Sequence, residues 1–388
     1  MEMKRICVQT AAALLAAVLL LPVDVCAVSA KSAILMDAQT GRVLYEKNAD
    51  HRSLIASTTK IMTALIVCEQ CNVLDRMRIP KEAVGIEGSS MYLKEGETLS
   101  LQELLFGLML HSGNDAAVAL AIYCGGTVEG FVALMNDKAR LLGLSDTHFV
   151  NPNGLDHPEH YSSARDLAVL TAYAMENPIF QKTVSTKTLT IGNRSMKNHN
   201  KLLWMINGAD GVKTGFTRAA GRVLVSSANR DGRRLVAVTI RDPNDWQDHQ
   251  KLLEEGFRNY TQRQVVSAGL KVGIRYVFNG VEGSVPILAA ENFYYPLMNN
   301  EEANVVLANP EFSFAPVTAG GHAGFAYICI GDNAVGKVAT VYGHTVEVKP
   351  PEKHGFWEGL FGGNKKLWIV CRRFFPLVVS HHGEKQRK

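Results

Sequence analysis

Hydrophobic and polar residues follow two patterns in the first two thirds of the chain. Short apolar runs flank polar turns at residues 33–45 and 222–240, which predicts two β-hairpins. Between them, apolar residues recur at helical spacing. The clearest helical segments are residues 60–67, 101–108, 131–142 and 163–175. Strands at both ends of a helical region predict an α+β domain over residues 31–262, with an antiparallel sheet covered by helices.

The pattern changes after about residue 262. Short apolar segments are now separated by Gly, Asn and Pro, and residues 327–330 and 337–341 read as two strands around a Gly331-Asp332-Asn333 turn. We therefore expect a small all-β domain over residues 263–350. It contains no recognisable cluster of catalytic residues.

The N-terminus has the pattern of a secretory signal. Lys4 and Arg5 precede an apolar stretch from about residue 11 to 22, and small residues follow it. We expect residues 1–30 to form a signal peptide cut after Ala27 or Ala30, and the protein to be exported to the outer face of the cytoplasmic membrane or the cell wall. An uncleaved anchor is the alternative, although the apolar run is shorter than the ~20 residues of a spanning helix.

Residues 351–388 form a tail of different composition. Aromatic and aliphatic residues are interrupted by basic pairs such as Lys365-Lys366 and Arg372-Arg373. Such an amphipathic basic and aromatic segment suits the membrane interface, and its interruptions argue against a spanning helix. We expect the tail to associate with a membrane surface. Packing of the tail on the protein itself is the alternative.

Composition excludes few functions. The chain has 388 residues, of which 47% are hydrophobic and 20% charged, so it can bury a substantial core. The net charge of +4 suits an anionic membrane or wall. Because the body of the chain has no basic run and no aromatic cluster of an RNA-binding type, we expect no nucleic-acid partner.

The cysteines give no regular pattern. Removal of Cys7 and Cys26 with the signal leaves an odd number without regular spacing, which argues against a disulfide framework. The remaining cysteines are Cys68, Cys71, Cys124, Cys329 and Cys371. The spacing of Cys68 and Cys71 is that of redox and zinc motifs, but the pair ends an apolar helical run and no second pair completes a metal site. We expect buried or half-buried helix cysteines.

Three short motifs carry the candidate chemistry. They are Ser57-Thr58-Thr59-Lys60, Ser112-Gly113-Asn114 and Lys213-Thr214-Gly215. Each is common alone. In this order they read as S-x-x-K, S-x-N and K-T-G, the signature of active-site serine enzymes that act on D-alanyl peptides or β-lactams.

The first motif predicts a nucleophile and its base. Ser57 precedes an apolar helical run, so we expect it at a helix N-terminus, where free N–H groups favour negative charge on Oγ. Lys60 lies on the same helix face, and burial beside Lys213 would lower its pKa enough for a general base. His111 is then expected to be structural. Taken alone, this motif also fits an ordinary helix cap with a solvated lysine.

The other two motifs predict substrate contacts. Ser112 can pass a proton to the leaving amine, and Asn114 can hold the peptide amide of the substrate. On a predicted edge strand, Gly215 lets a peptide backbone approach, while Lys213 and Thr214 attract a terminal carboxylate. Taken singly, the second motif fits a helix-linking turn capped by Asn114, and the third fits turn-forming glycines.

With the stretches at residues 147–155 and 207–217, these motifs resemble low-molecular-mass penicillin-binding proteins, the serine D-alanyl-D-alanine carboxypeptidases of peptidase family S11. The resemblance covers nearly the whole chain and implies a β-lactamase/transpeptidase-like domain. It implies that Ser57 attacks the penultimate D-alanine of a peptidoglycan stem peptide, and that the N–H groups of Ser57 and Phe216 form the oxyanion hole. Water then hydrolyses the acyl-enzyme, and β-lactam antibiotics acylate the same serine.

The resemblance implies no cofactor and no metal. The nearest candidate metal cluster, Asp156-His157 with His160, lacks a metalloprotease pattern. An arginine often assists carboxylate binding in such enzymes. We choose Arg241, which follows the second predicted hairpin, over Arg194.

Two other functions remain open. A serine β-lactamase is disfavoured because the middle motif is S-G-N instead of S-D-N, and because residues 151–161 lack an E-x-x-x-N element for deacylation. A non-catalytic cell-wall-binding protein of the same fold is the second alternative.

Overall fold

The computed structural model describes residues 28–308 and 312–350. The expected signal peptide, apart from residues 28–30, and the expected tail lie outside these residues. The described chain divides into two compact units. Residues up to Arg263 and Tyr295–Glu301 belong to the first, and Gln264–Tyr294 and the residues from Glu302 belong to the second. Residues 295–301 therefore group with the first unit, although the sequence analysis assigned them to the β-domain.

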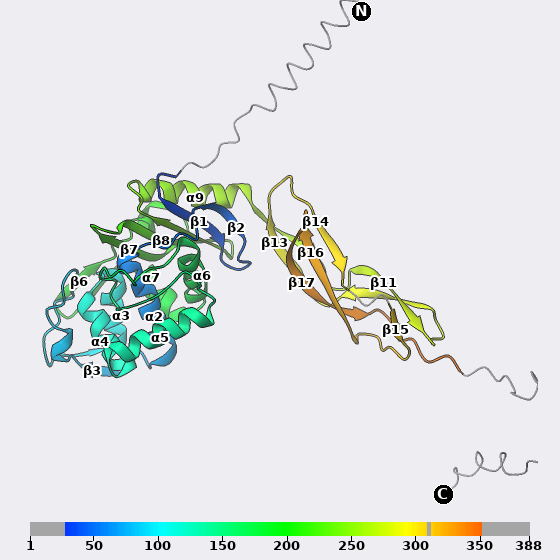
Figure 1. Ribbon diagram of the computed structural model, residues 1–388, viewed down its shortest axis with the longest axis horizontal. Coiled ribbons are helices and arrows are strands. Elements are labelled where there is room, and N and C mark those ends of the chain that lie inside the picture. The colour runs from blue at the N-terminus through cyan, green and yellow to red at the C-terminus, as the bar shows by residue number, and fades with distance from the viewer. Residues whose placement is uncertain (1–27, 309–311, 351–388) are drawn as a thin grey trace, which may run out of the picture. The chain divides into compact units, whose positions relative to one another are not determined.

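The first unit is built on one antiparallel sheet with the order β2-β1-β9-β8-β7 (Figure 1). Its strands are β1 (Ser32–Asp37), β2 (Val43–Lys47), β7 (Ala209–Thr217), β8 (Gly221–Arg230) and β9 (Arg233–Ile240). Both predicted hairpins are confirmed, as β1–β2 and β8–β9. The third motif lies on β7 at the sheet edge, which confirms its prediction as an edge strand.

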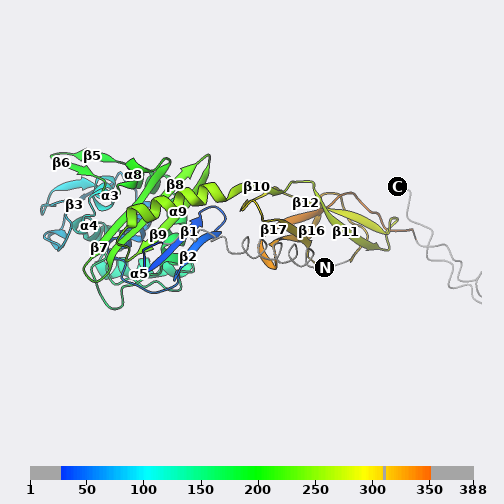
Figure 2. The ribbon, with the colours of Figure 1, turned by 90° about the horizontal axis from the view of Figure 1, so that it is seen from above.

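Helices cover both faces of this sheet, as Figures 1 and 2 show. The elements are η1 (Ala56–Thr59), α2 (Lys60–Gln70), η2 (Lys81–Ala83), α3 (Leu101–Leu110), α4 (Asn114–Gly125), α5 (Val128–Leu141), α6 (Ala164–Ala174), α7 (Pro178–Ser185), α8 (Leu202–Met205) and α9 (Asp245–Asn259). The four predicted helical segments correspond to α2, α3, α5 and α6. Two small two-stranded sheets pair β3 (Arg76–Arg78) with β4 (Thr98–Ser100) and β5 (Thr188–Ile191) with β6 (Arg194–Lys197).

The residues of β1 explain why both faces are covered. Every one of its residues is buried. Ile34 and Met36 pack with the core that includes α2 to α6, whereas Ala33 and Leu35 pack with Leu252 and its neighbours in α9. Because successive strand residues point to opposite faces, a continuous apolar strand needs a hydrophobic layer on each side.

Helix α2 is the central helix of the larger core. All of its residues from Lys60 to Cys68 are buried. A helix that is apolar on every side lies inside the protein, so the one charged residue at its start is held away from water. Within the described residues, no single helix has the length and hydropathy of a membrane-spanning helix, and α4 with α5 meets that test only as a pair bent by 84°.

The second unit is all-β and contains a six-stranded sheet with the order β14-β16-β17-β12-β11-β15. Its strands are β11 (Lys271–Phe278), β12 (Ser284–Ala289), β14 (Ala303–Leu307), β15 (Phe312–Phe314), β16 (His322–Ile330) and β17 (Asn333–Tyr342). The predicted strand, turn and strand are β16 and β17. Strands β10 (Thr261–Val266) and β13 (Phe293–Leu297) form a separate two-stranded sheet. The α+β fold class with a small all-β part is confirmed.

The expectation about the cysteines is wrong in one respect. Cys71, just after α2, forms a disulfide with Cys124 in α4. The pair is 53 residues apart in sequence and becomes adjacent only because α2 packs against α4. Cys68 is a buried free thiol, and burial raises its pKa to about 12, so it carries little of the thiolate that redox chemistry needs.

Removal of this disulfide should destabilise the first unit. For a loop of 53 residues, the chain-entropy model gives about 4 kcal/mol. We expect Cys71→Ala combined with Cys124→Ala to lower the free energy of unfolding by about 2–4 kcal/mol, measured by urea denaturation. The free Cys329 provides the control, because Cys329→Ala should change that free energy by less than about 1 kcal/mol. Equal effects of the two changes would contradict the prediction.

Candidate active site

Ser57 lies in a constrained turn before α2. It is part of η1, and α2 begins at Lys60, so the serine precedes the helix by one short turn. Ala56 has φ +47°, a left-handed conformation that residues with a side chain rarely adopt. A Cβ on Gly154 would stand 2.0 Å from the Ala56 carbonyl oxygen, so a side chain there would push this turn away. Such strain is typical of functional sites that their surroundings hold in place.

The amine of Lys60 joins the first two motifs. It is fully buried, and Nζ lies 2.9 Å from Ser57 Oγ, 2.6 Å from Asn114 Oδ1 and 2.6 Å from the Asn153 carbonyl oxygen. The two amide oxygens only accept hydrogen bonds and therefore take two N–H groups. A neutral amine has two N–H groups and one lone pair, so the lone pair is left for the Ser57 hydroxyl.

The surroundings favour this neutral form. Burial lowers the pKa of Lys60 well below its ordinary value, the charge of Lys213 lowers it further, and Asp115 opposes the shift. Burial also lowers the pKa of Lys213, to about 7. Because two cations repel each other in a buried site, loss of the proton from Lys60 makes it easier for Lys213 to keep its own.

Lys213 connects the second and third motifs. Its Nζ donates to Ser112 Oγ at 3.0 Å and to the Thr214 carbonyl oxygen at 2.8 Å. Ser112 follows α3, is buried and has φ +60°, so it is another residue in the left-handed region. The serine hydroxyl thus lies beside a lysine whose pKa is near neutrality, from which it can regain a proton.

Asn114 is the first residue of α4 and is buried. Its amide group donates to the Glu87 carbonyl oxygen, and its own oxygen accepts from Lys60. These bonds fix the orientation of the side chain. One lone pair of the amide oxygen remains, and it can accept an N–H from a bound peptide.

Strand β7 lies directly against the Ser57 turn. A Cβ at Gly215 would be 3.0 Å from the Ile55 oxygen and 3.1 Å from Ser57 N. Glycine is therefore the residue that permits this close approach of strand and turn.

The N–H of Phe216 faces the open edge of β7. Asp242 N donates to the Arg222 oxygen, so the backbone groups of Arg222 face β9. Arg222 is paired with Phe216 across β7 and β8. In an antiparallel pair, backbone groups that do not face each other point outward, so Phe216 N–H points away from β8. The N–H group of Phe216 is therefore free to bind a ligand at the strand edge. It lies next to Gly215, the residue that packs on the Ser57 turn.

The two candidate arginines make their hydrogen bonds outside the motifs. Arg241 is exposed, has φ +52° and donates to the Ala219 oxygen. Within the described residues it makes no hydrogen bond to any of the three motifs. Arg194 donates to Met91 O and forms an ion pair with Glu97 at 2.7 Å.

The sequence analysis missed residues that support the nucleophile. Val150 N donates to His160 Nδ1, so the ring proton is on Nε2 and is donated to Thr59 Oγ1 at 2.8 Å. Thr59 in turn donates to the Ala56 oxygen. Burial lowers the pKa of His160 to about 4, so the imidazole is neutral and holds the turn in place. No group of three metal-ligating side chains occurs within the described residues.

Asp115 was also missed. Its buried carboxylate accepts from Met91 N, Leu93 N and Ser90 Oγ and so holds residues 90–93 beside α4. An acidic residue in the first turn of a helix is a recognisable signal. The Asn153 carbonyl gave no signal at all, because a backbone acceptor can belong to any residue type.

Comparisons with known proteins agree with this geometry. The family model for D-alanyl-D-alanine carboxypeptidases matches residues 21–244, and the model for the penicillin-binding protein 5 C-terminal domain matches residues 260–348. The chain is similar to the D-alanyl-D-alanine carboxypeptidase DacF of Bacillus subtilis, with 33% identity over 71% of this chain and 75% of DacF. It is also similar to the D-alanyl-D-alanine carboxypeptidase DacD of Salmonella typhimurium, with 36% identity over 76% of this chain and 80% of DacD.

A solved structure extends the likeness to both units. Penicillin-binding protein 5 from Haemophilus influenzae superposes with a TM-score of 0.72 and 31% sequence identity. The match covers 83% of this chain and 98% of that protein.

The burial of Lys213 should make stability depend on pH. Its pKa is about 7 in the folded protein and ~10.4 in an unfolded chain. Between these values the unfolded chain binds more protons, so the wild-type free energy of unfolding rises with pH relative to a variant without this amine. We expect Lys213→Met to be more stable than wild type near pH 6, and the difference to shrink toward pH 9.

Urea denaturation at a series of pH values measures this difference. The exposed Lys81 gives a matched control, because Lys81→Met should show no such trend. The prediction is wrong if the difference in free energy of unfolding between Lys213→Met and wild type stays constant from pH 6 to pH 9. The pKa of Lys213 would then be the same in the folded and the unfolded chain.

Proposed function

Because this chain belongs to the D-alanyl-D-alanine carboxypeptidase family of serine hydrolases, peptidase family S11, we propose that Ser57 is its nucleophile. A carboxypeptidase of this family removes the terminal D-alanine from peptides that end in D-Ala-D-Ala. The hydrogen bond of 2.9 Å between Ser57 Oγ and the buried amine of Lys60 carries the assignment. Among the described residues, Ser57 is the one whose hydroxyl is hydrogen-bonded to that amine.

In the first step, Lys60 takes the proton of the Ser57 hydroxyl as Oγ attacks the carbonyl carbon of the penultimate D-alanine. The negative charge then develops on the carbonyl oxygen. We assign its stabilisation to the N–H groups of Ser57 and Phe216, because the second points to the open strand edge and Gly215 brings that strand against the turn. Fixed backbone donors need no rearrangement during the reaction.

In the second step, the C–N bond breaks and D-alanine leaves. Ser112 gives its hydroxyl proton to the leaving nitrogen and regains one from Lys213, to which it is hydrogen-bonded at 3.0 Å. The proton that Lys60 took from Ser57 then returns to Lys213, so that both amines recover their starting states. Water attacks the acyl-enzyme and gives a proton to Lys60, which passes it to Ser57 Oγ as the ester bond breaks. A β-lactam forms the same ester with Ser57, but its leaving nitrogen stays tethered in the site.

Substrate binding falls to the strand edge and to α4. We assign the terminal carboxylate to the charge of Lys213 and the hydroxyl of Thr214, and the peptide amide to the remaining lone pair of Asn114 Oδ1. Arg241 is kept as an accessory residue for the carboxylate. Its exposure allows its side chain to move, since its one hydrogen bond is to a backbone oxygen in the β7–β8 turn.

We also propose where the protein acts. Relatives of this family act on peptidoglycan, which lies outside the cytoplasm, and the signal pattern of residues 1–30 would export the chain there. Residues 31–262 would then supply the catalytic domain and residues 263–350 a β-domain without catalytic residues. The basic and aromatic tail at residues 351–388 would attach the protein to the outer face of the membrane.

The second unit offers support for a membrane surface. One face of β11 and β15 exposes five large apolar side chains, each at least 47% exposed, while the intervening Arg275 and Val277 are buried. The exposed residues are Ile274, Tyr276, Phe278, Phe312 and Phe314. The three phenylalanine rings contact one another, with centroids 5.3–5.9 Å apart.

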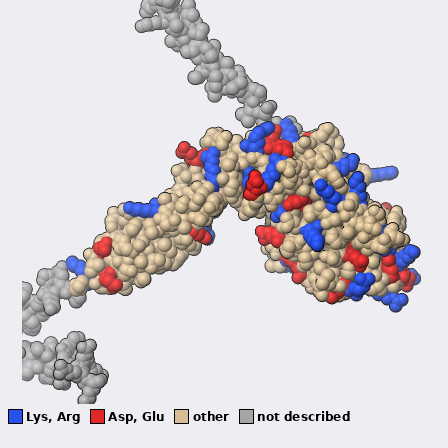
Figure 3. All heavy atoms as spheres, turned by 180° about the vertical axis from the view of Figure 1, so that it is seen from behind, with Lys and Arg blue, Asp and Glu red and all other residues tan. Residues whose placement is uncertain are grey.

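The last residues of the described chain lie beside this apolar face. Lys349 N donates to the Asn279 oxygen, next to Phe278, just before the described chain ends. On the side drawn in Figure 3, charged side chains are sparse over the second unit and mixed in sign over the first. An apolar face of this kind suits a lipid interface next to an interfacial segment.

Ser57→Ala tests the nucleophile. With Nα,Nε-diacetyl-L-Lys-D-Ala-D-Ala as substrate, we expect the variant to release D-alanine at least ~10³-fold more slowly, because the hydroxyl forms the acyl-enzyme. It should also lose covalent labelling by a fluorescent penicillin. The exposed Ser145 is the control, and Ser145→Ala should keep both properties. Release that persists in Ser57→Ala would refute the assignment, and rapid penicillin hydrolysis without a lasting acyl-enzyme would favour a β-lactamase.

Deletion of the tail tests the membrane proposal. We expect the chain from residue 31 to 388 to sediment with vesicles of phosphatidylglycerol and phosphatidylethanolamine, and the chain from 31 to 350 to bind at least ~10-fold more weakly. Both forms should release D-alanine from a small peptide at the same rate. Equal binding of the two forms would mean that the tail does not attach the protein.

A further inference from the structure

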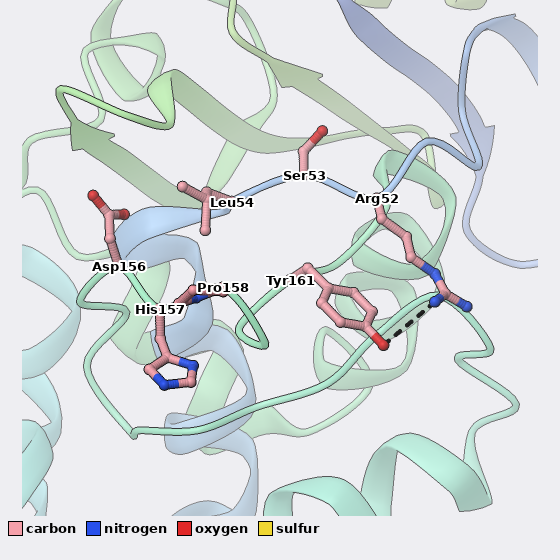
Figure 4. Close-up of a pocket in the computed structure, with 7 residues that line it drawn as sticks. All are labelled: Arg52, Ser53, Leu54, Asp156, His157, Pro158 and Tyr161. Carbon is pink, nitrogen blue, oxygen red and sulfur yellow. Dashed lines mark hydrogen bonds between the residues drawn. The ribbon is translucent and has the colours of Figure 1, made fainter.

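A cavity of about 550 Å³ lies beside the turn that carries Ser57. Its walls come from residues 52–54, which lead into that turn, and from the loop at residues 156–161, as Figure 4 shows. The polar side chains at the cavity include Asp156, whereas Leu54 and Pro158 provide apolar surface. None of these residues has a role in the reaction described above.

Strand β7 connects the cavity to the reaction centre. Lys213 reaches Ser112, Gly215 faces the Ser57 turn, and Thr217 Oγ1 donates to Asp156 Oδ1 at 2.9 Å. Alternate residues of a strand share one face, so these three positions lie in a row. Asp156 therefore lies at one end of this row, next to Thr217, and Lys213 lies at the other end.

A bound substrate extends along the same row. With its terminal carboxylate at Lys213 and its scissile carbonyl at Phe216 N–H, a peptide added to the edge of β7 runs antiparallel to the strand. The penultimate D-alanine then pairs with Phe216, and the residue before it lies opposite Thr217. Side chains directly opposite in an antiparallel pair share a face, with Cβ atoms about 4.5–5.5 Å apart. The side chain of that residue thus emerges next to Asp156.

Resting on the proposed function, we propose that this cavity binds the third residue of the stem peptide, and that Asp156 binds the free amino group of a diamino acid there. Asp156 Oδ1 accepts from Thr217, and Oδ2 has no hydrogen-bond partner within the described residues. The nearby cation does not neutralise this carboxylate, because Arg52 pairs with Asp146 at 2.9 Å.

The shape of the cavity fits the rest of such a side chain. Leu54 and Pro158 offer an apolar surface for the methylene groups, and Figure 4 shows the ring of Tyr161 beyond Pro158, on the side away from Asp156. A long side chain with an amine at its end can therefore bury its stem and keep its charge at the exposed carboxylate.

Two peptides that differ only at this amine test the proposal. They are Nα-acetyl-L-Lys-D-Ala-D-Ala and Nα,Nε-diacetyl-L-Lys-D-Ala-D-Ala, and the ratio of their kcat/KM values for D-alanine release is measured. We expect wild type to prefer the free amine by about 3- to 5-fold, as for an exposed ion pair, mainly through a lower KM. In Asp156→Asn, which still accepts from Thr217, the ratio should fall to about 1.

Glu159→Gln is the matched control. Glu159 is an exposed acid of the same loop outside the cavity wall, so this variant should keep the preference. A wild type that does not distinguish the peptides, or a preference that survives in Asp156→Asn, overturns the proposal while leaving the carboxypeptidase activity in place. Failure of wild type to release D-alanine from either peptide overturns the proposed function as well.

Discussion

The site depends on one buried amine. A lysine inside a hydrophobic core is costly as a cation, so it is held there either by neutralisation or by hydrogen bonds. Lys60 has both, since the oxygens of Asn114 and Asn153 accept its two N–H groups and its lone pair is left for Ser57. The same burial that disfavours the cation lowers the pKa of Lys60 and favours the neutral amine that we propose as the base. This is how a helix that is buried from Lys60 to Cys68 can begin with a charged residue type.

The surrounding chain keeps the hydroxyl within reach of that amine. The turn at Ala56 is strained, and it is held by Thr59, by the neutral imidazole of His160 and by the close approach of Gly154. On the other side, Gly215 lets the edge strand come within contact distance. The cost of the strained turn is met by packing across the whole unit, so the fold and the reactivity of Ser57 are not separable.

Local patterns predicted the elements well because the forces that set them are local or nearly so. The hairpins of β1–β2 and β8–β9 follow from apolar runs broken by turns, and α3 follows from leucines at helical spacing. The cysteines show the opposite case. Cys71 and Cys124 are separated by 53 residues, and only the packing of α2 on α4 brings them together. The sequence analysis therefore missed the disulfide, as it missed the backbone carbonyl of Asn153.

By itself, the sequence determined the fold class, the family and the identity of the three motifs, because these depend on residue types at fixed spacing. Only the tertiary structure decided how the motifs act on one another. It placed Lys60 where two oxygens take its protons, joined Ser112 to Lys213, and turned the N–H of Phe216 to an open edge. It also set Asp156 beside Thr217, at the end of β7 away from Lys213. Burial, hydrogen-bond direction and strand register arise between residues distant in the chain, and no local pattern encodes them.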